Sequence, residues 1–299
     1  MKKLLLFLSL VSAIKASAQP QQKNEQIMIN GLQRHFVTYI PATDGNSGKL
    51  PVIISLHGRL GNGNGMMHFA DFRPLADQYK FIIVCPDGID RSWNDGRATP
   101  ANRKGVDDVR FIDELITYIT KTYNGDAKRV YVTGMSNGGF MSSRLACELS
   151  DKIAAIAVVG ASMDGSMSYH PVNAIAVMYI QGTKDPLVPF AGGAMKGAGG
   201  EIYGHEELLA LWADADHCEK KTLITNLPDN AGDGTSIIRE EYINKATGTK
   251  VIGYTITNGG HTWPGGTQYL PKMMIGPVTH NLNACQVIWD FFKEYKLKD

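Results

Sequence analysis

Apolar and polar residues alternate along the chain in blocks that predict strands and helices in turn. The segments LPVIISLHG (50–58) and KFIIVCPDG (80–88) are continuous apolar runs that stop at glycine, which is typical of strands buried on both faces. HFVTYIP (35–41) instead alternates apolar and polar residues and predicts an early antiparallel strand. Further strands are predicted at RVYVTG (129–134), IAAIAVVG (153–160), IAVMYIQG (175–182) and KVIGYTIT (250–257).

Helical periodicity appears between and after these strands. VDDVRFIDELITYITKTY (106–123) repeats apolar residues at helical spacing and begins with aspartates, which favour the positive end of the helix dipole. GFMSSRLACE (139–148) and LNACQVIWDFFKEY (282–295) predict two more helices. This alternation favours an α/β fold with a mostly parallel central sheet flanked by helices. We interpret the glycine-rich segment 190–204 as a mobile loop near the functional site, and no linker divides the chain.

The first residues predict export. A short basic start is followed by an apolar run over 4–14 and by the small residues Ala16-Ser17-Ala18, as in a secretory signal peptide. We therefore expect a signal peptide over 1–18, cleaved near Ala18, and a single catalytic domain over 19–299. Later apolar runs are short, so we expect no membrane span. The expected location is secreted or periplasmic.

Composition narrows the possible partners. The full chain of 299 residues has a formal charge of +1, and without residues 1–18, which hold three lysines, the balance becomes −2. A near-neutral chain argues against nucleic acid as a partner. Of the cysteines, Cys85 and Cys147 fit buried positions, whereas Cys218 and Cys285 are the better candidates for a bridge, with the pairing left open. No spacing of Cys or His suggests zinc.

The segment YVTGMSNGGFMSSRLACE (131–148) is the centre of the predicted chemistry. It places Gly134-Met135-Ser136-Asn137-Gly138, a G-x-S-x-G motif, between a predicted strand and a predicted helix. In that context the motif predicts a nucleophile elbow, a strained turn that holds a serine hydroxyl clear of the sheet. Ser136 is therefore the candidate nucleophile, and the alternative is a glycine-rich turn with an incidental serine.

A serine hydroxyl needs an adjacent base that is itself held by a carboxylate. On this kind of fold the partners follow in the order Ser, acid, His. Asp185 follows the predicted strand 175–182, and His261 follows the predicted strand 250–257, so both lie at strand ends, where α/β sheets bind ligands. Other candidates have weaker settings: His205, His217, His280, Asp151 and Asp164.

An oxyanion hole is expected to complete the site. One donor is the N–H of Asn137, directly after the nucleophile, and the other comes from the loop after strand 50–58. We assign the second N–H to Arg59, with Leu60 as the alternative. His57 ends a buried strand and precedes the serine, so we interpret it as a structural hydrogen-bonding residue rather than a second base.

Several longer blocks carry a family resemblance: LHGRLGN, PDGIDRSWNDGR, DDVRFIDELI, GMSNGGFMSSRLACELSDKIAAIA, QGTKDPLVPF and GGHTWPGG. Together they resemble the poly(3-hydroxybutyrate) depolymerase and feruloyl esterase branch of the α/β-hydrolases, close to carbohydrate esterase family 1. The resemblance implies an α/β-hydrolase fold and a serine esterase with Ser136, Asp185 and His261 in the triad positions. It also suggests that Trp93, Asn94 and Trp263 bind substrate at the acyl pocket. The family often carries a small residue where Arg59 stands.

The sequence thus predicts a secreted serine esterase that acts through a Ser-His-Asp triad and an acyl-enzyme, with no metal or organic cofactor. Feruloyl or acetyl esters of plant polysaccharide are the first expected substrates, and poly(3-hydroxybutyrate) or hydroxyalkanoate oligomers are the alternative. A peptidase or a lipase fits less well. A non-catalytic binding protein of the same fold is a minor alternative, because all three triad members are present in order. We expect an ester substrate as a partner, and we expect no nucleic acid and no membrane.

Overall fold

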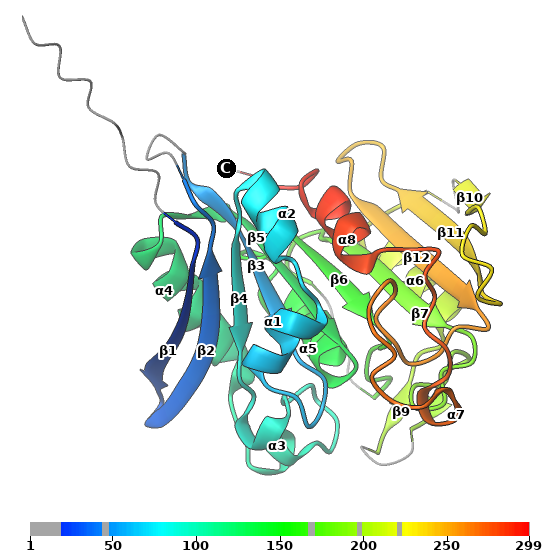
Figure 1. Ribbon diagram of the computed structural model, residues 1–299, viewed down its shortest axis with the longest axis horizontal. Helices are drawn as coiled ribbons and strands as arrows, with labels where there is room; N and C mark the ends of the chain where they lie inside the picture. Colours follow the sequence, from blue (N-terminus) through cyan, green and yellow to red (C-terminus); the bar gives the residue numbers. More distant parts are fainter. Residues whose placement is uncertain (1–18, 44–47, 167–170, 196–198, 220–222, 299) are drawn as a thin grey trace, which may run out of the picture.

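A mixed sheet of ten strands runs through the protein, with the strand order β1-β2-β4-β3-β5-β6-β7-β12-β11-β10 (Figure 1). The computed structural model describes residues 19–43, 48–166, 171–195, 199–219 and 223–298. The expected signal peptide over 1–18 lies outside the described residues. The strands are β1 Gln21–Ile29, β2 Leu32–Ile40, β3 Leu50–Leu56, β4 Ile82–Pro86, β5 Gly125–Met135, β6 Ala155–Val159, β7 Ala176–Gly182, β10 Leu223–Asn226, β11 Ser236–Ile243 and β12 Lys250–Thr257. A separate two-stranded sheet joins β8 Gly193–Ala194 to β9 Glu201–Ile202.

Six neighbouring strands, from β4 to β12, are parallel, and antiparallel strands flank them on both sides. Each predicted strand is present, and the alternating segment 35–41 falls in β2, which is antiparallel to its neighbours as predicted. In the ten-stranded sheet, β1, β10 and β11 were not predicted from the sequence. These strands lie at the two edges of the sheet, and Figure 1 shows β1 in dark blue and β10 and β11 in yellow to orange.

The missed edge strands have polar sequences. β1 reads QQKNEQIMI, and most of its side chains are exposed or half-buried. Such a strand is held by its backbone ladder with β2 rather than by burial, so it lacks the apolar signal from which a buried strand is recognised.

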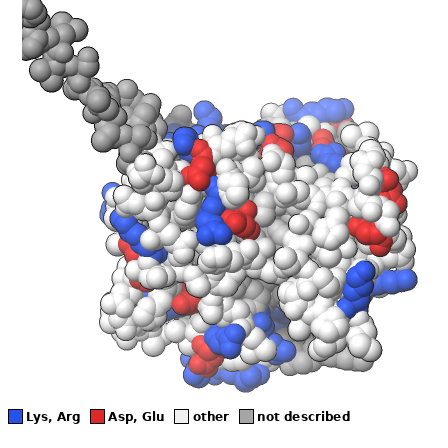
Figure 2. Space-filling view, viewed as in Figure 1, with Lys and Arg blue, Asp and Glu red and all other residues white. Residues whose placement is uncertain are grey.

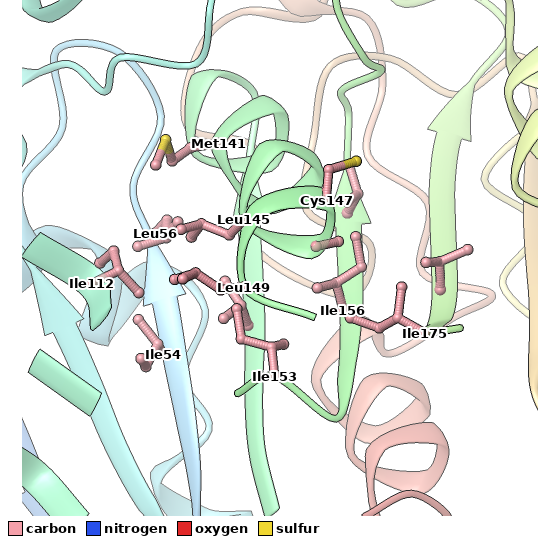
Figure 3. Packing of buried hydrophobic residues seen from close by; sticks show 14 of the residues in the cluster. Ile54, Leu56, Ile112, Met141, Leu145, Cys147, Leu149, Ile153, Ile156 and Ile175 are labelled. Carbon is pink, nitrogen blue, oxygen red and sulfur yellow. The ribbon is translucent and has the colours of Figure 1, made fainter. Parts of the chain in front are cut away.

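Helices cover both faces of the sheet. One face carries α4 Asp108–Thr122, α5 Asn137–Glu148 and α6 His205–Ala215, and the other carries α1 Gly63–Phe69, α2 Arg73–Tyr79 and α8 Ala284–Phe292. Two short helices, α3 Pro100–Arg103 and α7 Lys272–Ile275, and the 3-10 turn η1 Ile89–Arg91 lie in loops. Figure 3 shows how the first layer packs, with Leu145 of α5 against Leu56 of β3 and Ile112 of α4 beside them. The predicted helices over 106–123, 139–148 and 282–295 are therefore confirmed as α4, α5 and α8.

The four cysteines are free thiols. Cys218 packs against the core under α4, α5 and α6, whereas Cys285 belongs to the core on the opposite face of the sheet. The expectation that these two cysteines would be the better candidates for a bridge is wrong, because the sheet lies between them.

Charged side chains of both signs are mixed over the face of the molecule that Figure 2 shows, with uncharged surface between them. Across the described parts of the chain, no helix is long and apolar enough to span a membrane.

Candidate active site

The carboxyl ends of β5, β7 and β12 meet at one end of the parallel strands, and the three predicted catalytic residues follow them. Ser136 comes directly after β5, Asp185 three residues after β7, and His261 four residues after β12. A cavity of about 580 Å³ opens at this end, and its lining includes Ser136 and His261 together with Asn137 and Arg59. The fold thus brings together residues that are far apart in the sequence.

Ser136 occupies the strained turn that the motif predicts. Its backbone has φ 54° and ψ −125°, a conformation that residues other than glycine rarely adopt, and its N–H donates to Val159 O over 3.0 Å. The turn requires glycine at position 138, because a Cβ there would lie 2.2 Å from Leu56 O. A Cβ on Gly134 would lie 2.4 Å from Gly138 O. The start of α5 therefore packs directly on the backbone of β3 and β5, which raises the serine at the end of the sheet.

Asp185 and His261 form a buried pair. Nδ1 of His261 lies 2.7 Å from Oδ2 of Asp185, and both residues are less than a tenth exposed. The other carboxylate oxygen of Asp185 accepts hydrogen bonds from the N–H groups of Leu187 and Val188, each over 2.8 Å. Because the carboxylate is held from both sides, it fixes the imidazole with Nδ1 as the donor. The other ring nitrogen, Nε2, is then the one able to accept a proton.

The backbone of His261 is held as firmly as its ring. Its N–H donates to Ile275 O over 2.6 Å, and its carbonyl accepts a hydrogen bond from the Tyr269 hydroxyl over 3.0 Å. Burial raises the pKa of Tyr269 to about 12, so this hydroxyl remains a donor across the physiological range. Tyr269 also lines the cavity, which gives it contact with both the histidine loop and the cavity.

The hydrogen bonds of the loop after β3 decide between Arg59 and Leu60 as the second oxyanion donor. Leu60 N–H donates to Arg91 O over 2.8 Å, and Gly61 N–H donates to Gly58 O over 2.9 Å, so both are occupied. The Arg59 N–H has no hydrogen-bond partner among the described residues. The alternative of Leu60 as an oxyanion donor therefore does not fit this structure, whereas the N–H groups of Arg59 and Asn137 remain candidates.

His57 supports this loop as a neutral residue. Its Nε2 accepts a hydrogen bond from Gly88 N–H over 3.0 Å, which leaves the proton on Nδ1, 2.8 Å from Gly58 O. Burial lowers the pKa of His57, which also favours the neutral ring. These contacts agree with the interpretation of His57 as a structural hydrogen-bonding residue.

Trp93, Asn94 and Trp263, which the resemblance suggested as substrate-binding residues, do not line the cavity. Trp93 is fully buried and donates its indole N–H to His57 O over 2.9 Å. The side chain of Asn94 donates to Val106 O and accepts from Asn102, and Trp263 is buried edge-on against Phe69. The family resemblance had suggested that these residues border the acyl pocket, but the two tryptophans fill the core behind the cavity wall.

Most residues of the cavity wall were not predicted from the sequence. Apolar side chains dominate it, and they include residues from four separate segments: Met66, Phe69, Phe140, Leu187, Val188, Tyr269 and Leu270. A buried ion pair between Asp95 and Arg97 lies beside them. The block SWNDGR holds both charges next to a glycine, which was the available signal in the sequence, but the pairing itself depends on the fold.

Asn137 connects this pair to the proposed oxyanion donors. Its side chain accepts from Trp93 N–H over 2.8 Å and donates to Trp93 O over 3.1 Å, and its Nδ2 also lies 2.7 Å from Asp95 Oδ2. The first residue of α5 is thus locked to the loop 93–97.

In the described residues, no cluster of three or more His, Cys, Asp or Glu is placed to hold a metal ion.

Known proteins match this chain over most of its length. The family described as "Esterase PHB depolymerase" matches residues 35–202, more than half of the chain. "Putative esterase NocK" of Nocardia uniformis subsp. tsuyamanensis is 29% identical over 252 residues, which cover 81% of this chain and 73% of that protein. "Feruloyl esterase D" of Neurospora crassa is 29% identical over 212 residues, covering 64% of this chain and 70% of that protein.

Solved structures match the fold. An acetyl xylan esterase from Aspergillus awamori superposes with a TM-score of 0.57 at 17% identity, covering 80% of this chain and 94% of that chain. A structure titled as a thermostable esterase gives a TM-score of 0.52 at 18% identity, covering 65% of this chain and 52% of that chain. At such identities the likeness is one of fold, and it confirms the predicted α/β-hydrolase fold.

Proposed function

The chain belongs to the esterase PHB depolymerase family of carboxylic ester hydrolases, and from that premise we propose that it is a secreted serine esterase with a Ser136-His261-Asp185 triad. The observation that carries the proposal is the site itself. The strained Ser136 and His261 line one cavity, and Nδ1 of His261 is hydrogen-bonded to the carboxylate of Asp185.

In the proposed reaction Ser136 Oγ attacks the ester carbonyl while Nε2 of His261 takes its proton. Asp185 orients the imidazole and stabilises the imidazolium, and the N–H groups of Asn137 and Arg59 donate to the oxyanion. The alcohol leaves with a proton from His261. Water, activated by the same histidine, then releases the acid from the acyl-enzyme.

The proposed substrates are feruloyl or acetyl esters of plant polysaccharide. Support comes from the names of similar proteins, which include a feruloyl esterase and an acetyl xylan esterase, and from the mainly apolar cavity wall, which suits an aromatic acyl group. Hydroxyalkanoate oligomers are the second candidate, favoured by the family match. We further propose one catalytic domain over 19–299 and export through residues 1–18.

The decisive test is kcat/KM on methyl ferulate beside a 3-hydroxybutyrate oligomer, with Ser136→Ala as the blank. Preference for ferulate would support the first substrate class, and preference for the oligomer would support the second. A fluorophosphonate probe should label the wild-type protein and leave Ser136→Ala unlabelled. Failure of the wild-type protein to label would contradict the serine-esterase proposal and favour a binding protein.

A further inference from the structure

Arg97 is a buried cation in the wall of the cavity. Only 4% of the residue is exposed, yet it belongs to the cavity lining together with Phe140 and Met195. Its guanidinium carbon lies 3.4 Å from the centroid of the Phe140 ring, so the planar group is stacked on the first turn of α5, close to Ser136 in the chain. The proposed mechanism assigns no role to this group.

The guanidinium has more donors than the described residues use. An arginine presents five N–H groups. Nη2 donates to Asp95 Oδ2 over 2.5 Å, and Nη1 is 3.1 Å from the thioether sulfur of Met195, a weak acceptor. Nε is buried and has no hydrogen-bond partner among the described residues. Three of the five N–H groups therefore find no protein acceptor there, which is costly for a buried polar group.

The charge balance decides what could satisfy those donors. Asp95 is 1% exposed and already neutralises the guanidinium. A carboxylate on the substrate would leave one uncompensated negative charge in an apolar cavity, which is unfavourable. A neutral oxygen acceptor, such as a hydroxyl, a methoxy group or a second ester carbonyl, would satisfy a donor without adding charge.

Building on the proposed function, we propose that Arg97 is a specificity-determining residue that donates a hydrogen bond to a neutral oxygen of the ester substrate other than the scissile carbonyl. Phe140 and Asp95 fix the guanidinium in place, and Met195 marks where its free edge meets the cavity. An ester that carries such an oxygen reacts faster than the analogue that lacks it, because the analogue leaves a buried donor unpaired.

The test compares pairs of esters that differ by the oxygen. The pairs are methyl ferulate with methyl cinnamate, ethyl 3-hydroxybutyrate with ethyl butyrate, and 2-hydroxyethyl butyrate with ethyl butyrate. In the wild-type enzyme we expect at least one pair to show a preference of about tenfold in kcat/KM for the oxygenated ester. The pair that responds identifies which part of the substrate Arg97 contacts.

The double variant Arg97→Met with Asp95→Asn removes the donor and leaves no unpaired buried charge. Its preference should fall to within about twofold of unity. Arg97→Lys keeps the positive charge but lacks the planar guanidinium. Its preference for the oxygenated ester should lie between those of the wild type and the double variant. Arg103→Met is the matched control. It removes an exposed arginine of the same loop, whose Nη1 donates to Ala98 O, and should keep the wild-type preference.

Because the preference is a ratio measured on one enzyme sample, a partly unfolded variant does not alter it. Equal loss on both esters of every pair, with the ratio unchanged, would overturn the proposal and leave Arg97 a structural residue. That result is distinguishable from failure of the proposed function, since hydrolysis that survives in Ser136→Ala would contradict the mechanism itself.

Discussion

Buried carboxylates accept different numbers of hydrogen bonds at the two ends of the parallel strands. At the carboxyl end, around the cavity, Asp185 and Asp95 each accept three hydrogen bonds. Asp185 accepts from two backbone N–H groups and from His261. Asp95 accepts from the backbone and the side chain of Arg97 and from the side chain of Asn137. At the amino end, Asp216 is fully buried and accepts one bond, from Ile175 N–H just before β7.

The contrast shows where the fold places its donors. The second carboxylate oxygen of Asp216 has no partner among the described residues, and burial raises its pKa to about 7. The two carboxylates at the cavity are surrounded by donors that stabilise negative charge. The molecule supplies donors to the carboxylates that act in or beside the site, and it tolerates an unsatisfied acid where no chemistry is proposed.

The largest predicted effect comes from the proposed nucleophile. Ser136→Ala should reduce kcat/KM on an ester by about 10,000-fold or more, because no acyl-enzyme can form. Far-UV circular dichroism and the thermal midpoint should stay close to those of the wild type, since the glycines and not the hydroxyl form the turn. Residual activity within tenfold of wild type would rule out the assignment.

Asp185→Asn should reduce kcat by about 1,000-fold at nearly unchanged stability. The amide oxygen can still accept from Leu187 and Val188 N–H, but its NH₂ then faces His261 and favours the wrong imidazole tautomer. Steady-state kinetics and a urea titration on the same protein check both parts. A loss of stability with normal kcat would mean that the pair is structural.

Asp95→Asn should reduce stability strongly and kcat only modestly, the reverse of Asp185→Asn. It leaves the buried Arg97 guanidinium uncompensated, so the free energy of unfolding should fall by about 3 kcal/mol. Since Asn137 loses part of its anchor, kcat should fall only by about tenfold. A larger rate loss than that of Asp185→Asn would contradict the distinction between the two carboxylates at the cavity.

Asp216→Asn should have the smallest effect, and it should stabilise the protein rather than destabilise it. Asp216 has a folded-state pKa of about 7 against an ordinary value of 3.8, so the folded protein binds the proton more tightly than the unfolded chain. Its destabilising contribution therefore grows between about pH 4 and pH 7 and is complete above pH 7. The amide can still accept from Ile175 N–H.

The variant should therefore be more stable than wild type by on the order of 2 kcal/mol at pH 8, with no gain at pH 4. Urea unfolding at the two pH values measures the difference. Equal stability of the two proteins at pH 8 would show that the carboxylate finds partners that compensate its burial.

Local sequence was sufficient for the elbow and for the central strands. The order of strand, G-x-S-x-G and helix around Ser136 forces one backbone geometry, and continuous apolar runs such as 50–58 have few alternatives to a buried strand. The positions of Asp185 and His261 at strand ends could be predicted for the same reason, because parallel strands bring their carboxyl ends to one edge. Their catalytic roles stay predictions until the variants above are measured.

The sequence by itself determined the α/β pattern, the strained turn at Ser136 and the strand ends that carry Asp185 and His261, because these features depend on residues adjacent in the chain. Tertiary structure alone decided that Trp93 and Trp263 fill the core instead of the cavity. It also decided that Cys218 and Cys285 face opposite sides of the sheet, and that Arg97 stacks on Phe140 in the cavity wall. Those outcomes depend on how segments far apart in the sequence pack against one another. Local periodicity and short motifs do not contain that information.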